Sequence, residues 1–92
     1  MGIRKRIADA LELQQDVMLN LPVLHITGSE RLLLENHRGL LEYARDRIRV
    51  ATTAGVVVIE GEGLTIRSVG RDDLLVTGAI RMVTMGNAGV KR

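Results

Sequence analysis

The sequence contains no cysteine, tryptophan or phenylalanine, and a single tyrosine is its only aromatic residue. Without cysteine, neither a disulfide framework nor a thiolate metal site can form. Hydrophobic residues still make up 46% of the chain, so the core must be built from leucine, isoleucine, valine and methionine. A chain of 92 residues provides one compact core. The composition therefore predicts one small domain with an aliphatic, β-prone core.

Long apolar runs are also absent. The longest, residues 32–34 and 56–59, have the length of strands, far below the roughly 18 to 20 residues that span a bilayer. Asp9 and Glu12 interrupt the apolar stretch that a secretory signal would need after the basic start. We expect neither a membrane span nor a signal peptide.

The first residues have the spacing of an amphipathic helix. Apolar side chains recur at three- and four-residue intervals over residues 3–13, which predicts a short helix there. The cations Arg4, Lys5 and Arg6 lie at its N-terminus, where they oppose the helix macrodipole. Something outside the helix therefore accounts for their placement, and we treat these three cations as candidate interaction residues. The helix could pack on the rest of the fold, on a partner helix, or on an anionic membrane surface.

After Pro22 the pattern changes to short β-rich runs separated by glycine, asparagine and aspartate. We predict an all-β fold with a short N-terminal amphipathic helix and about eight strands in an antiparallel meander or sandwich, with a short parallel β-solenoid as the alternative. The expected organisation is an amphipathic segment over 1–21, a β domain over 22–85 and a flexible tail over 86–92. The predicted strands are residues 23–27, 31–35, 40–43, 47–52, 56–60, 64–68, 74–77 and 80–85.

A weak internal repeat runs through this region. Ile26, Tyr43, Ile59 and Val76 begin segments offset by 17, 16 and 17 residues, and three of them continue with a glycine two positions later. The repeat indicates units of two strands each. Residues 32–34 and 56–59 are apolar on both faces of a strand, which implies a second layer or another copy of the protein.

The densest polar cluster is Glu35, Asn36, His37, Arg38 and Gly39. Its position between two predicted strands favours a hairpin loop, in which Asn36 and Gly39 supply the turn conformations and His37 faces water. The alternative, an acid–base pair of Glu35 and His37, lacks a nearby nucleophile or second carboxylate. We therefore treat these five residues as candidate interaction residues and predict no catalytic ones.

Other potential sites are weaker. His25 and His37 have no recognisable third metal ligand, and Gly61-Glu62-Gly63 continues as a strand where a dinucleotide site needs a helix. We predict no metal and no cofactor. Arginines on several strands could form a basic stripe for nucleic acid, but acidic residues are interleaved with them and stacking aromatics are missing. No nucleic-acid partner is expected.

The chain resembles the YabP/YqfC family of sporulation proteins. The most specific part of the resemblance is the stretch from Glu35 to Gly39, and it continues into Leu40-Leu41-Glu42-Tyr43. The further residues that carry it are 16–22, 26–28, 47–50, 55, 59–61, 64–66 and 76–80.

This resemblance implies a part in endospore formation, in the cytoplasm of the mother cell around the engulfed forespore. It also implies a membrane-protein partner and no enzymatic activity. Combined with the two-sided apolar strands, it leads to the hypothesis of a non-enzymatic scaffold that self-associates and docks to that partner, with the N-terminal segment as a peripheral contact to the outer forespore membrane. The alternatives are a nucleic-acid-binding β module and a small hydrolase.

Overall fold

The computed structural model describes residues 21–86, and these form one antiparallel sheet of six strands. Their order in the sheet is β1-β2-β6-β5-β4-β3. The predicted N-terminal helix and nearly all of the predicted tail lie outside the described residues. The strands are β1 (Val23–Thr27), β2 (Arg31–Glu35), β3 (His37–Tyr43), β4 (Arg47–Thr52), β5 (Gly55–Val69) and β6 (Asp73–Met85).

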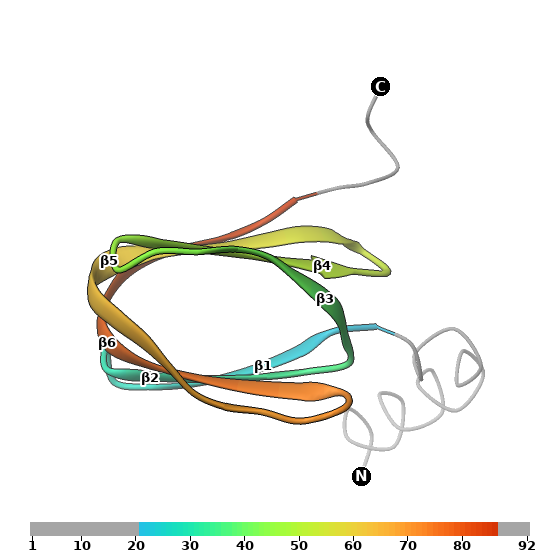
Figure 1. The fold of residues 1–92 in the computed structure, drawn as a ribbon, viewed down its shortest axis with the longest axis horizontal. Helices are drawn as coiled ribbons and strands as arrows, with labels where there is room; N and C mark the ends of the chain where they lie inside the picture. The colour runs from blue at the N-terminus through green and yellow to red at the C-terminus, as the bar shows by residue number, and fades with distance from the viewer. Residues whose placement is uncertain (1–20, 87–92) are drawn as a thin grey trace, which may run out of the picture.

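The sheet is folded onto itself (Figure 1). β5 and β6 are long and bend midway, so each contributes to two layers that face each other. We call these the β1 layer and the β3 layer. The β1 layer contains β1, β2 and the parts of β5 and β6 next to their connecting turn. The β3 layer contains β3, β4 and the remaining halves of β5 and β6. This all-antiparallel pairing confirms the all-β prediction and excludes the solenoid.

The predicted number of eight strands is wrong, because two glycine sites thought to end strands instead bend them. The register between β5 and β6 shifts around Gly61 and Gly63, and Gly78 adopts φ 135°. A Cβ on Gly61 would overlap the carbonyl of Ala79, and one on Gly78 would lie 2.7 Å from the carbonyl oxygen of Gly63. Glycine is therefore required where the two bent strands come closest.

The core lies between the layers and contains aliphatic residues from both. Strict alternation within the strands turns one side chain in two inward, as in the buried Ile48 and Val50 of β4. The ten buried core residues are Leu32, Leu34, Ile48, Val50, Val57, Ile59, Leu64, Leu74, Val76 and Ile80.

The internal repeat corresponds to an approximate twofold relation between the layers. Ile26 and Tyr43 each lie near the turn of a hairpin, and Ile59 and Val76 each precede a bend. The β1–β2 turn accepts hydrogen bonds from the bend of β6, where Gly78 N–H donates to Glu30 O at 3.1 Å. Equivalently, Gly61 N–H in the bend of β5 donates to Asp46 O in the β3–β4 turn at 3.1 Å. Each hairpin turn thus holds one bend in place.

Candidate interaction site

The stretch from Glu35 to Gly39 forms a corner of the fold and is not the hairpin loop that its sequence predicts. β2 and β3 are not neighbours in the sheet, and the chain passes between the layers at Asn36 (Figure 1). Asn36 has φ 69°, and it is the one non-glycine residue in the described part of the chain with a positive φ. Asparagine tolerates this left-handed conformation better than most residues.

Hydrogen bonds fix this corner to the turn between β5 and β6. The backbone N–H groups of Asn36 and His37 both donate to Asp72 O, at 2.6 and 3.1 Å. The Asn36 side chain donates from Nδ2 to Leu21 O at 2.8 Å. Nε2 of His37 lies 3.4 Å from Gly70 O, and its Nδ1 is buried without a partner in residues 21–86. His37 therefore contacts the protein itself, contrary to the prediction that it faces water.

Glu35 and His37 do not form the acid–base pair considered above. Oε2 of Glu35 lies 3.6 Å from Nε2 of His25, on the neighbouring strand β1. Arg38 is exposed and Gly39 half-buried at the start of β3. The five candidate residues thus lie together at this corner, but Glu35, Asn36 and His37 make their contacts within the protein itself. Arg4, Lys5 and Arg6 lie outside the described residues.

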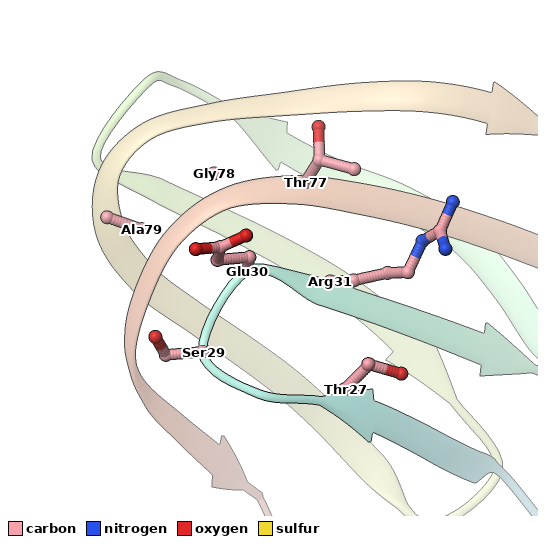
Figure 2. A pocket seen from close by; sticks show the side chains of 7 residues that line it. All are labelled: Thr27, Ser29, Glu30, Arg31, Thr77, Gly78 and Ala79. Atoms are coloured by element: carbon pink, nitrogen blue, oxygen red, sulfur yellow. The ribbon is translucent and has the colours of Figure 1, made fainter.

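A pocket lined by described residues lies away from this corner. The pocket shown in Figure 2 lies where the β1–β2 turn rests against the bend of β6, and neither Glu35 nor His37 lines it. Its lining residues are Thr27, Ser29, Glu30, Arg31, Thr77, Gly78 and Ala79. No helix in residues 21–86 has the length and apolarity that crossing a bilayer requires. Across the same residues, no three His, Asp or Glu side chains are grouped so as to hold a metal ion.

Three arginines of the strands lie beside or opposite carboxylates. Arg49 of β4 is 3.7 Å from Glu42 of β3, and Arg81 is 3.0 Å from Glu62. Arg47 stands opposite Glu60 in the β4–β5 register. Such pairing breaks up the positive stripe that phosphate binding needs, which weakens the argument for nucleic-acid recognition.

The two outer strands of the sheet could not be located from the amino-acid sequence. β1 and β3 are the two outer strands, and both expose apolar side chains. On β3 these are Leu40, Leu41 and Tyr43, but two register shifts against β4 make β3 irregular. β1 pairs with β2 without any shift, and its Ile26 is 51% exposed. Irregularity hinders an outer strand from adding another strand. By contrast, β1 is regular and carries no Lys, Arg, Asp or Glu, and no other strand of residues 21–86 lies on its outer side.

A sequence signal for β1 exists but is ambiguous by itself. Pro22 precedes a run without Lys, Arg, Asp or Glu, and Gly28 follows it. Proline before a strand is compatible with an outer position. The strand order is still needed to show that this run lies at the boundary of the sheet.

Comparison with known proteins places the chain in a family. The family model described as YabP family matches residues 20–92, which includes the whole described sheet. The chain belongs to the YabP family. YqfC of Bacillus subtilis strain 168, described as an uncharacterized protein, is 33% identical over 88 residues, covering 90% of this chain and 95% of the relative. No solved structure matches the chain.

The residues that the YabP family model matches include the corner at Glu35 to Gly39 and all six strands, β1 among them. Residues 1–19, which make up most of the predicted amphipathic segment at 1–21, precede the matched region. The YabP match therefore concerns the sheet, and the role of the N-terminal cations must be tested separately.

Proposed function

We propose that this YabP-family chain is a non-enzymatic interaction module of the sporulating cell, which self-associates and docks to a membrane-protein partner in the mother cell. The observation that carries the self-association is the regular strand β1, whose outer side meets no other strand of residues 21–86 and whose Ile26 is exposed. A free strand of this kind offers backbone hydrogen bonds to another strand, and the apolar side chains beside it gain from being covered.

The polar groups that could support chemistry favour the same proposal. Glu35 is beside His25, and Asn36 and His37 connect two layers of the sheet. A catalytic role needs such groups to be directed at a substrate position. Here they are directed at the backbone or at one another, as expected for residues that hold a scaffold together.

Mass measurement of the full chain tests the self-association. Light scattering over a concentration series from micromolar to millimolar should show a rise from monomer towards dimer mass, since an interface of modest size gives weak association. A monomer mass throughout the series would overturn this part of the proposal.

The membrane-protein partner is supported by the family resemblance and by the basic segment that precedes the sheet. Affinity capture from detergent-solubilised sporulating cells should recover one membrane protein with the full chain. Replacing Arg4, Lys5 and Arg6 by glutamine tests their contribution, and replacing Arg47, Arg49 and Arg67 by glutamine is the matched control with the same charge change. Recovery that falls only with the first set supports docking through the N-terminal cations. Equal recovery with both sets would place the contact on the sheet, and no membrane protein with any variant would overturn the docking proposal.

A further inference from the structure

The hydrogen-bond pattern of the sheet identifies the backbone groups of β1 that face away from the protein. Gly78 N–H donates to Glu30 O, and Asn36 N–H donates to Asp72 O, at the two ends of the β2–β6 ladder. Bonded and non-bonded pairs alternate in an antiparallel ladder, so the even-numbered residues of β2 bond to β6. Its odd-numbered residues bond to β1, in the pairs Val23–Glu35, His25–Leu33 and Thr27–Arg31. The N–H and C=O groups of Leu24 and Ile26 consequently point outward. We call these groups the β1 edge.

The same reasoning identifies a second stretch whose backbone groups point outward, at the C-terminal end of β6. Gly86 N–H donates to Val56 O, which places Thr84 in a bonded pair with Val58 and directs the backbone of Val83 and Met85 away from β5. β2 pairs with β6 only through residues 73–77, so this β6 edge has no neighbouring strand among residues 21–86. It includes Arg81 and lies next to a register shift against β5, whereas β1 is regular along all five of its residues and carries no Lys, Arg, Asp or Glu.

On the half of β5 next to the β5–β6 turn, two outward N–H groups already have hydrogen-bond acceptors. Leu64 N–H donates to Arg45 O at 2.8 Å, and Ile66 N–H donates to the Tyr43 hydroxyl at 3.0 Å. Ile26 stands at the position that corresponds to Tyr43 in the repeat, but its side chain has no hydroxyl. Tyr43 therefore satisfies the outward N–H of Ile66 on β5, and Ile26 provides no such hydrogen bond to β6.

Resting on the proposed self-association, we infer that two copies pair through their β1 strands, antiparallel and about a twofold axis at His25. In this register Leu24 of each copy lies opposite Ile26 of the other. Both residues have outward backbone groups, so two bonded pairs with two hydrogen bonds each would form. Leu24 and Ile26 also face the core side of the sheet, which brings the exposed Ile26 against Leu24 of the other copy.

Other antiparallel registers are less favourable for physical reasons. A shift by one residue opposes outward backbone groups to groups already bonded to β2. A shift by two in one direction sets Ile26 opposite Pro22, which has no N–H to donate. A shift by two in the other direction sets Leu24 opposite Gly28, where φ is 56° and the strand has ended. The sequence around β1 thus favours the register centred on His25, and β1 carries no Lys, Arg, Asp or Glu that would be brought close to its copy.

Proline substitution tests this inference, because it removes an N–H only at the chosen edge. In Ile26→Pro the lost N–H is one that points outward, and the bonds of Val23, His25 and Thr27 to β2 remain. Met85→Pro is the matched control, since it removes an outward N–H from the β6 edge at a residue of similar exposure. Sedimentation equilibrium of the full chains should show self-association weakened about tenfold or more by Ile26→Pro and unchanged by Met85→Pro. Circular dichroism checks that both variants fold.

Amide hydrogen exchange of the unchanged protein provides a test that does not depend on the folding of a variant. The amides of Leu24 and Ile26 should exchange more slowly as concentration rises through the dimer transition, and those of Val83 and Met85 should not. If the protein self-associates but the amides of Leu24 and Ile26 show no such change, the β1 pairing is overturned and self-association still stands. The same conclusion follows if only Met85→Pro abolishes self-association. A chain that stays monomeric would overturn both.

Discussion

Tyr43 shows how one residue can distinguish two otherwise similar halves of a molecule. Its hydroxyl accepts the N–H of Ile66, on the half of β5 that has lost its neighbour β4. The equivalent residue in the other layer, Ile26, has no hydroxyl, although the two side chains are about equally exposed. The difference of one side chain therefore gives β5 a hydrogen bond that Ile26 cannot provide to β6.

Tyr43→Phe should destabilise the fold by about 0.5 to 1.5 kcal/mol, the usual net contribution of one hydrogen bond. The ring remains, so packing changes little. Denaturant unfolding measures the loss, and the Ile66 amide should exchange faster in the variant. Unchanged stability together with unchanged exchange at Ile66 would show that the hydroxyl does not accept this hydrogen bond.

At Asn36 two contributions can be separated by two substitutions. Asn36→Gly keeps a backbone suited to φ 69° but loses the side-chain bond to Leu21 O, so we expect about 1 kcal/mol of destabilisation. Asn36→Ala loses the bond and also strains the backbone, which should cost about 2 kcal/mol or more. Urea unfolding compares the two. Equal effects would mean that the left-handed conformation contributes nothing.

Among the elements, β5 and β6 determine the architecture. Each is long enough to serve both layers, and their glycines allow the backbones to cross closely at the bends. The hairpin turns at Glu30 and Asp46 hold these bends by accepting their N–H groups. The bend of β5 is therefore sensitive to any added side-chain volume.

Gly61→Ala should destabilise the protein by about 3 kcal/mol or more, because its Cβ would overlap the carbonyl of Ala79 and backbone cannot move aside as a side chain can. Gly39→Ala is the matched control, since a Cβ there meets nothing within 4 Å and its φ is not positive. Thermal and urea unfolding should show a large loss for the first variant and little or none for the second. Similar losses in both variants would contradict this account of the bend.

For the whole molecule, the two layers share one core and two strands, so they should fold as one unit. Leu34 in one layer and Val50 in the other are both fully buried in this core. Because each layer is completed by half of β5 and half of β6, loss of packing in one layer removes support from the other.

Leu34→Ala should accordingly cost about 2 to 5 kcal/mol and shift a single unfolding transition. Leu41→Ala is the control for the same substitution at an exposed site, where the change should stay within about 0.5 kcal/mol. Far-ultraviolet circular dichroism follows the sheet, and Tyr43 fluorescence follows the β3 layer. Separate midpoints for the two signals in Leu34→Ala would contradict a single cooperative unit.

Local features of the fold could be predicted from the amino-acid sequence. Alternation and β-branched residues predicted the strands and, in residues 47–50, their inward face correctly, because side-chain direction along a strand depends only on the neighbouring residues. Resemblance in the stretch from Glu35 to Gly39 identified the family.

Features that depend on which strands pair could be seen only in the three-dimensional fold. Gly61 and Gly78 were predicted to separate strands, and the residues around Asn36 were predicted to form a hairpin, since a glycine or asparagine allows a turn, a bend or a corner equally well. Which of these forms is set by distant segments, namely the bends packed against the hairpin turns and Asp72 placed beside Asn36. The free side of β1 has the same origin, because a strand lies at the boundary of a sheet only by virtue of where all the other strands pair.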